Sequence, residues 1–209
     1  CVEKYNIVIE NILSSYQGIF QKLVDFVAKM DFYKGAAKLS IKNNYQKPKL
    51  SQEDLDYSFI EAKNLRHPII EKIDVSTEYV PNDIELGKSI NGILLYGVNA
   101  SGKSSLMKSV GLNVIMAQAG MFVAADEFYY NPYHSIFTRI GNQDNIFKSQ
   151  STFEVEMSEL RNIIKRANSH SLILGDELCS GTESISALAI VSSSIITLYE
   201  KLSSLIFAT

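Results

Sequence analysis

The residues best suited to chemistry lie in one short run, Gly97-Val98-Asn99-Ala100-Ser101-Gly102-Lys103-Ser104. This run fits the pattern G-x-x-x-x-G-K-[ST], in which backbone N–H groups curl around phosphates at the start of a helix. Lys103 would reach the β and γ phosphates, and the Ser104 hydroxyl would bind Mg²⁺. A glycine-rich turn without a ligand is the alternative, but the four fixed positions arise by chance in only about one such chain in a hundred. The run predicts a site for a nucleoside triphosphate and Mg²⁺.

Two adjacent carboxylates, Asp176 and Glu177, follow the apolar run at residues 171–175. A P-loop needs a second group to hold its metal, and Asp176 is the candidate. Glu177 is the candidate general base, because a carboxylate beside the γ phosphate polarises the attacking water. In isolation such a pair is also typical of a solvated loop. After an apolar strand in a chain with a P-loop, it favours hydrolysis over phosphoryl transfer to an alcohol.

A third candidate is Ser151, with Glu154 three residues later. This spacing is a capping box at the start of a helix. A capped helix is the plain structural interpretation. The N-terminus of a helix with hydroxyl groups also binds anions, so Ser151 could face a phosphate, including one held by another subunit.

The elements that must position these residues follow from hydrophobic periodicity. Beyond Leu50, short apolar strands alternate with helices, which indicates an α/β layer architecture. Strands are expected at residues 92–96, 135–140, 171–175 and 204–208. Helices are expected at residues 103–118, 152–168 and 183–202. The first strand leads into the P-loop and the first helix follows it, which is the context that the motif requires.

The N-terminal region has a different pattern. Apolar residues recur with helical periodicity from Tyr5 to Met30, which predicts one long helix. A lysine-rich segment follows, in which Lys34, Lys38 and Lys42 share one face if it is helical. This face is solvated or contacts phosphates. Pro48 ends the helix. We therefore expect a helical region at residues 1–49 and a nucleotide-binding domain at residues 50–209.

Charge is unevenly distributed. Residues 1–49 carry 8 Lys and 4 acidic side chains, whereas the remainder of the chain carries 12 basic and 19 acidic side chains, which gives the overall net charge of −3. The pI near 5.7 argues against a surface that binds phosphate backbones generally. Any contact with nucleic acid is expected to be local or to lie in other segments.

The composition excludes several classes of protein. A hydrophobic content of 46% and a charged content of 21% are typical of a folded globular chain. Cys1 and Cys179 are too far apart to suggest a disulfide framework or a metal site, which favours a reducing, intracellular compartment. That compartment is the cytoplasm, the nucleoid, an organelle or a virus-associated site. No apolar run approaches the roughly 18 residues that cross a bilayer, so no membrane partner is expected.

From about Asp31 to Thr209, the chain resembles the ATPase region of the MutS DNA mismatch-repair family, with features of its viral or organellar branch. Seven matching runs occur in the family's order: Leu65-Arg66-His67-Pro68 with Glu71, Tyr79-Val-Pro-Asn-Asp83, Gly97 to Ser105, Phe137-Thr-Arg-Ile-Gly141, Ser151-Thr-Phe153 with Glu156-Met157, Asp176-Glu177 with Gly181-Thr182, and Phe207-Ala-Thr209. Each run is weak evidence by itself. Their order over most of the chain makes the resemblance strong.

The resemblance implies roles for individual residues. Tyr79 would stack on the adenine, although a tyrosine of a β-sheet is the alternative. Asn99 would sense the nucleotide, and Ser151 would approach the γ phosphate bound by the opposite subunit. Gln143 and Asp144 would lie near the metal and the attacking water. The N-terminal helix would be the end of a lever that returns from a DNA clamp.

The chain departs from the family at several positions. Ser105 replaces a usual threonine, which preserves the hydroxyl group. Cys179-Ser180 replaces a usual Gly-Arg pair, which puts details of signalling between subunits in doubt. The first residue is Cys1 and not Met, and the histidine that the family places after Phe-Ala-Thr would come after Thr209, so we expect the chain to be cut at both ends. The three histidines, His67, His134 and His170, are expected to be structural.

The sequence thus predicts a P-loop NTPase of the ABC-ATPase type, with a mixed sheet flanked by helices and a long helical lever before it. It would bind and hydrolyse ATP in a homodimer and move a clamp on mismatched or otherwise damaged DNA, which domains upstream would contact. The chain by itself is not expected to show full ATPase activity. One alternative is another ABC-type or chromosome-maintenance ATPase, which ordinarily carries a Leu-Ser-Gly-Gly signature. A second is a nucleotide-gated dimerisation module with negligible turnover, against which Glu177 argues.

Overall fold

The computed structural model describes residues 2–73, 79–98, 100–139, 152–176, 178 and 184–209. The chain divides into two compact units, Cys1–Asn44 and Tyr45–Thr209. This division falls a few residues before the domain boundary expected at residue 49, so the short strand β1 (Lys49–Leu50) belongs to the second unit. Each unit is described by itself below.

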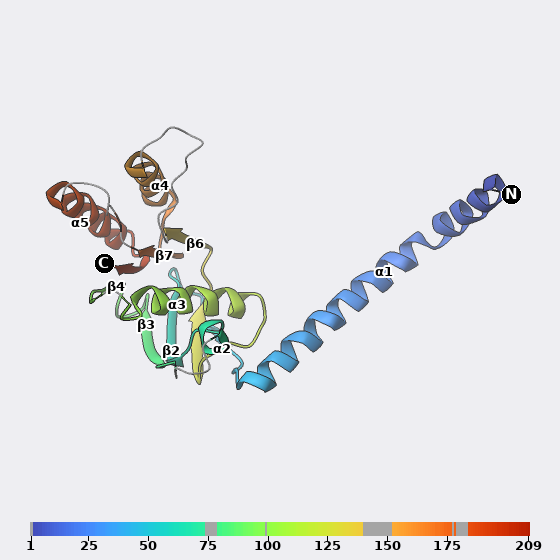
Figure 1. Cartoon of the computed structure of the whole chain (residues 1–209), viewed down its shortest axis with the longest axis horizontal. Helices are drawn as coiled ribbons and strands as arrows, with labels where there is room; N and C mark the ends of the chain where they lie inside the picture. Colours follow the sequence, from blue (N-terminus) through green and yellow to red (C-terminus); the bar gives the residue numbers. More distant parts are fainter. Residues whose placement is uncertain (1, 74–78, 99, 140–151, 177, 179–183) are drawn as a thin grey trace. The chain divides into compact units, whose positions relative to one another are not determined.

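The first unit is a single long helix, α1 (Val2–Asn43). The predicted helix at residues 5–30 is therefore confirmed, and it continues through the lysine-rich segment (Figure 1). Asn44 adopts a left-handed conformation with φ 52°, which is a common way for a helix to end, and Pro48 prevents its continuation. Lys34, Lys38 and Lys42 are exposed along one face, as their spacing requires.

A four-stranded mixed sheet begins the second unit, with the order β1-β5-β2-β3. Strands β2 (Phe59–Leu65), β3 (Asn82–Leu86) and β5 (Glu127–Asn131) pair antiparallel, whereas β1 is parallel to β5. Apolar and charged side chains alternate along these strands, so one face is buried and the other is solvated. For example, Ile60 pairs with Leu86 and Ala62 with Ile84 on the buried face.

A second sheet is entirely parallel, with the order β4-β8-β7-β6. Its strands are β4 (Gly92–Leu95), β6 (Ser135–Arg139), β7 (Ser171–Asp176) and β8 (Ser204–Ala208). The two central strands, β7 and β8, are buried along almost their whole length. This agrees with their continuous apolar sequences, because a parallel sheet is covered on both faces.

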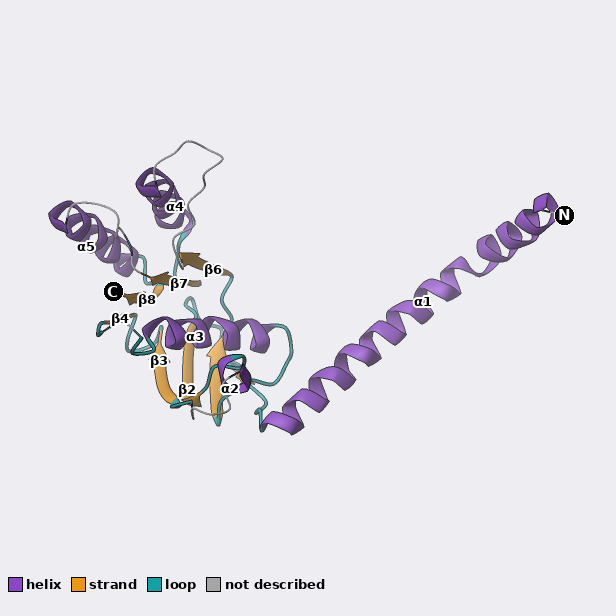
Figure 2. Cartoon of the chain, in the orientation of Figure 1, coloured by secondary structure: helices purple, strands orange, loops and turns teal. Residues whose placement is uncertain are grey.

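Helices separate and cover the two sheets (Figure 2). Helix α3 (Lys103–Gln118) lies between them, and its Met107, Val110 and Val114 share one core with residues of both sheets. Helices α4 (Thr152–Arg166) and α5 (Ser184–Glu200) cover the other face of the parallel sheet through a second core. A short helix, α2 (Ile70–Ile73), precedes β3. The order of layers is mixed sheet, α3, parallel sheet, and then α4 with α5 (Figure 1).

The expectation of a mixed α/β fold with helices flanking β-structure is confirmed. The described strands form two sheets, one mixed and one parallel, because the strands with alternating charges need a solvated face, whereas the apolar strands need cover on both faces. The predicted strands and helices of the second sheet are present to within a few residues at their ends. In the residues that the structure describes, no helix has the length and apolarity to cross a membrane.

Candidate functional site

The P-loop connects β4 to α3, as its motif requires. Gly102, the residue before the helix, has φ 94°, a left-handed conformation that glycine adopts without strain. Ala100 is also left-handed, with φ 66°. Within the loop, the Ser101 amide donates a hydrogen bond to the Val98 carbonyl (3.3 Å). The Leu106 amide donates to the Gly102 carbonyl (2.9 Å) in the first turn of α3, so the end of the loop leads directly into the N-terminus of this helix.

Lys103 is the first residue of α3, and its side chain folds back over the loop. The Nζ atom donates hydrogen bonds to the carbonyl oxygens of Gly97 (2.7 Å) and Val98 (3.0 Å). Its positive charge therefore lies within the loop, where the positive end of the helix dipole also lies. Ser104 and Ser105 follow on the first turn of α3, both partly buried.

A cleft of about 830 Å³ opens beside the P-loop. This volume is within the usual range for small-molecule sites, about 300–1,000 Å³. The loop and α3 form one wall, and the segment that leads into β3 forms another. The residues that line the cleft are Ile70, Tyr79, Val80, Asn82, Leu94, Leu95, Tyr96, Ala100, Ser101, Gly102, Lys103, Ser105 and Leu106. The structure therefore brings Tyr79 and Lys103 to one cleft, whereas Ser104 and Asp176 are not part of its lining.

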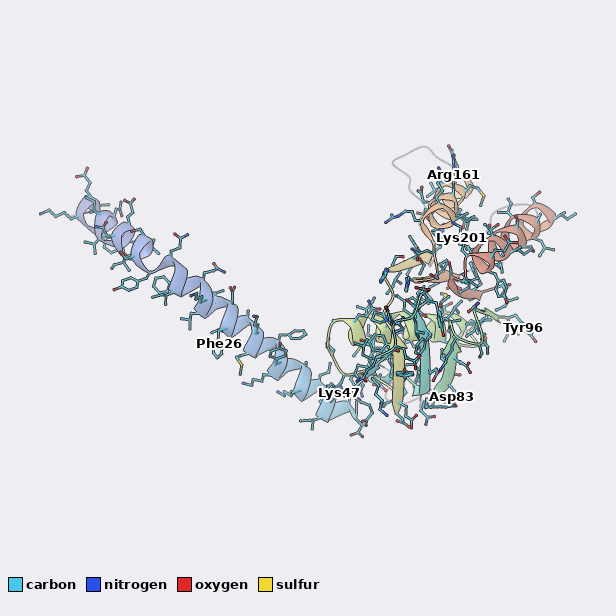
Figure 3. All side chains as sticks on the ribbon, turned by 180° about the vertical axis from the view of Figure 1, so that it is seen from behind. Phe26, Lys47, Asp83, Tyr96, Arg161 and Lys201 are labelled. Carbon is cyan, nitrogen blue, oxygen red and sulfur yellow. The ribbon has the colours of Figure 1, made fainter. Side chains whose placement is uncertain are left out.

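Tyr79 lines the same cleft from outside the P-loop motif. Its ring lies 6.5 Å from the His67 ring, centroid to centroid, and its hydroxyl has a hydrogen bond with Ser109 of α3. Burial raises the pKa of the Tyr79 phenol above its ordinary value. The phenol is therefore neutral at physiological pH and offers a flat aromatic surface to the cleft. By contrast, Tyr96 at the opposite edge is 85% exposed and points away from the body of the protein (Figure 3).

His67 supports this wall and is structural, in agreement with the sequence. Its side chain is 5% exposed, and its Nδ1 atom accepts hydrogen bonds from the Ile69 and Ile70 amides, both at 3.2 Å. An Nδ1 atom that accepts carries no proton. His67 is therefore neutral and caps the start of α2.

Buried polar side chains fix α3 and α2 beside the cleft. Asn113, on α3, donates to the carbonyl oxygens of Arg66 (3.0 Å) and Ser109 (2.8 Å), and its Oδ1 atom accepts from the Ala124 amide (2.7 Å). Glu71, which is almost buried, accepts from the Tyr45 hydroxyl (3.0 Å) and from Arg66 (3.2 Å). The role of Asn113 was not predicted from the sequence, because Arg66 and Ala124 lie in other segments of the chain.

Asp176 lies at the edge of the parallel sheet where the P-loop also begins. It is the last residue of β7 and pairs with Ala208 at the end of β8. Since β8 separates β7 from β4, Asp176 and the P-loop follow strands that are about 10 Å apart. Carboxyl ends of parallel strands are where α/β proteins bind ligands.

The environment of Asp176 fits a cation. Its Oδ1 atom is buried and has no hydrogen-bond partner among the residues that the structure describes. A buried, unpaired carboxylate oxygen is costly, and a metal ion satisfies it. Oxygen ligands such as this carboxylate and a serine hydroxyl are those that Mg²⁺ prefers.

Several predicted residues lie outside the described part of the structure. These are Asn99 in the P-loop, Ser151 before α4, Glu177 after Asp176, and the loosely assigned Gln143 and Asp144. Their roles stay predictions from the sequence. The residues next to two of them are described: α4 begins at Thr152, directly after Ser151, and β7 ends at Asp176, directly before Glu177.

The seven sequence runs and this geometry can be compared with known proteins. A sequence model of the family described as MutS domain V matches residues 93–209, more than half of the chain. The chain belongs to the MutS family. The match begins in β4 and includes the P-loop, β7 with Asp176, and β8.

Individual relatives extend the similarity to almost the whole chain. A mitochondrial DNA mismatch repair protein mutS homolog of Sarcophyton glaucum is 40% identical over 99% of this chain and 21% of its own length. A mutS homolog of Acanthamoeba polyphaga mimivirus is 38% identical over 94% of this chain and 21% of its own length. The DNA mismatch repair protein MutS of Caldicellulosiruptor bescii is 43% identical over 81% of this chain and 19% of its own length.

These comparisons confirm the resemblance that the motifs predicted, and mitochondrial and viral proteins are among the relatives. The chain spans about a fifth of the length of these relatives.

Proposed function

We propose that this chain is the ATP-binding and ATP-hydrolysing part of a MutS-type DNA mismatch-repair protein. The observation that supports this most is the cleft itself, in which the P-loop lysine and the aromatic ring of Tyr79 line one cavity. A phosphate-binding loop at one end and an aromatic face at the other suit a purine nucleotide. Adenine would stack on Tyr79, and Lys103 would move from the loop carbonyls to the β and γ phosphates.

The metal would be held by Ser104 and Asp176. When bound, Mg²⁺ would neutralise charge on the phosphate oxygens. The chain's own groups would do the rest: backbone amides from Gly97 to Lys103 would orient the phosphates, and Glu177 would accept a proton from the attacking water. The water oxygen would form the new bond to the γ phosphorus as the bond to the β-γ bridging oxygen breaks, which yields ADP and inorganic phosphate.

In the proposed dimer, Ser151 of one subunit would complete the nucleotide site of the other. ATP binding would then draw the subunits together, and α1 would transmit this change to a clamp on mismatched or damaged DNA. Contact with DNA would belong to other parts of the full-length protein. Membership of the MutS family removes support for the alternative of an unrelated ABC-type or chromosome-maintenance ATPase.

Binding of ATP by the full-length protein tests the nucleotide assignment. Lys103→Ala should weaken ATP affinity about 10- to 100-fold, because it removes charge-assisted hydrogen bonds worth about 1.5–3 kcal/mol. Lys108→Ala is the matched control, since Lys108 is an exposed lysine on the same helix. Titration of a fluorescent ATP analogue in the presence of Mg²⁺ measures both. Equal affinity of wild type and Lys103→Ala would refute the proposed site.

A further inference from the structure

The buried ion pair between Arg139 and Glu156 joins the parallel sheet to α4. The Arg139 Nη2 atom donates to Glu156 Oε1 at 3.1 Å, and its Nε atom lies 3.1 Å from Glu159 Oε2. The side chains of Arg139 and Glu156 are 12% and 7% exposed, whereas that of Glu159 is 48% exposed. Two charges are thus removed from water at one point of contact between a strand and a helix.

The position of this pair connects two parts of the proposed site. Arg139 is the last residue of β6 and pairs in register with Gly175, the residue before Asp176. Glu156 lies about one turn after the start of α4, and Ser151 directly precedes that start. The pair therefore connects the end of β6, which lies beside the end of β7 with Asp176, to the start of α4, which follows Ser151.

Because the pair is buried, it restricts the position of α4 on the sheet. A buried carboxylate needs a partner, so α4 can keep Glu156 at this depth only where Arg139 meets it. The other end of α4 is also attached: the Lys201 Nζ atom donates to the carbonyl oxygens of Ile164 (2.6 Å) and Ala167 (3.4 Å), close to the end of α5 (Figure 3). Helix α4 is thus attached near both of its ends, by the pair of Arg139 with Glu156 and by Lys201.

We propose that Arg139 and Glu156 are positioning residues that set the start of α4, and hence Ser151, relative to the sheet edge of their own subunit. This inference rests on the proposed function, in which Ser151 acts on ATP bound by the opposite subunit. It follows that loss of the pair impairs turnover at the partner's nucleotide site and leaves ATP binding at the P-loop of its own subunit intact.

Steady-state kinetics of the full-length protein give the first test. Glu156→Gln should lower kcat about tenfold or more, while ATP affinity changes less than about threefold, because the lost contact acts in turnover and not in binding. Glu159→Gln is the matched control: it touches the same arginine from an exposed position and should change kcat less than about twofold. Equal effects of the two variants on kcat would overturn the proposal.

Mixed dimers distinguish positioning of the partner's site from general damage to the subunit. A Lys103→Ala subunit mixed with a Glu156→Gln subunit leaves one intact P-loop facing one intact α4, so ATP turnover should recover. Recovery should match that of a Lys103→Ala and Ser151→Ala mixture. If only the Ser151 mixture recovers, the positioning role is wrong and the proposed function stands. If neither recovers, the two-subunit site is refuted and the positioning role with it.

A second variant guards against a folding defect. Arg139→Lys keeps the positive charge but loses the planar group that reaches both carboxylates. If Glu156→Gln does not fold, as judged by thermal unfolding, Arg139→Lys replaces it in the mixture, with the same expected recovery and the same contradicting result.

Discussion

His67 illustrates how one buried side chain shapes the wall of the cleft. Its Nδ1 atom accepts hydrogen bonds from the Ile69 and Ile70 amides at the start of α2, and its ring lies beside Tyr79. Burial lowers the pKa of His67 below its ordinary value near 6.5, because the charged form is poorly solvated there. Protonation would also remove the hydrogen bonds that cap α2, since a protonated Nδ1 atom cannot accept a hydrogen bond.

We therefore predict a loss of stability in mild acid. A depressed pKa means that the unfolded chain binds a proton before the folded chain does, so the contribution of His67 is fully present above about pH 6.5. It is lost as the pH falls through the folded-state pKa, by at most about 1.4 kcal/mol per pH unit. Urea unfolding at pH 7.5 and 5.5 measures this.

The control is His67→Gln, which cannot titrate. Its unfolding free energy should depend less on pH than that of the wild type over the same interval. His170, whose pKa burial also lowers, remains in both proteins and contributes equally. An identical pH dependence in the two proteins would show that His67 does not carry the effect.

At the scale of single residues, the sequence predicted those whose chemistry depends on local spacing. Lys103 and Ser104 could be proposed as site residues because a P-loop motif is continuous in the chain. The contacts of Asn113 with Arg66 and Ala124 and the pair of Arg139 with Glu156 were missed, because each joins segments that only the fold brings together. The cap formed by His67 is local in sequence, but a histidine is not a usual capping residue. One sign of the pair of Arg139 with Glu156 was present in the sequence. Glu156 is a charged residue at a buried position of a helix, and such a residue usually has a partner of opposite charge.

At the scale of elements, contact between β7 and β8 places Asp176. Gly175 lies opposite Phe207, and a Cβ atom at Gly175 would come within 2.5 Å of the Phe207 ring. The ring is buried and has little room to move. The glycine therefore allows Phe207 to pack directly on the strand end that carries Asp176.

Gly175→Ala should destabilise the protein by about 1–3 kcal/mol, as overpacking of a core does. Gly92→Ala is the matched control in the same sheet, because its Cβ would meet Leu205 at an ordinary contact distance of 3.8 Å. That control should change stability by less than about 0.5 kcal/mol. Thermal unfolding of both variants measures the difference, and similar melting temperatures would contradict the packing argument.

Elements were predictable to unequal degrees. The strands of the parallel sheet stand out because they are continuous apolar runs, and α3, α4 and α5 because they lie between them. Strands β2, β3 and β5 were not located, since their outward residues are charged and resemble those of loops. The separation into two sheets also depends on α3 packing between them, which no local pattern reveals.

At the scale of the whole molecule, charge distinguishes the two regions of the chain. Residues 1–49 carry a net charge of +4, with the lysines of α1 exposed, whereas the acidic remainder contains the cleft. The proposed binding of phosphate in the cleft would therefore depend on backbone amides and one lysine, and not on the net charge of the domain. The family was predictable from the order of seven short runs.

ATP turnover by the full-length protein and its Glu177→Gln variant tests the central claim most directly. The wild type should hydrolyse ATP in the presence of Mg²⁺. Glu177→Gln should bind ATP with an affinity within about threefold of the wild type but lose turnover by about 100-fold or more, because it keeps the shape of the side chain and removes the base. Equal rates of hydrolysis by the two proteins would contradict the mechanism, and no hydrolysis by either would favour a nucleotide-gated dimerisation module.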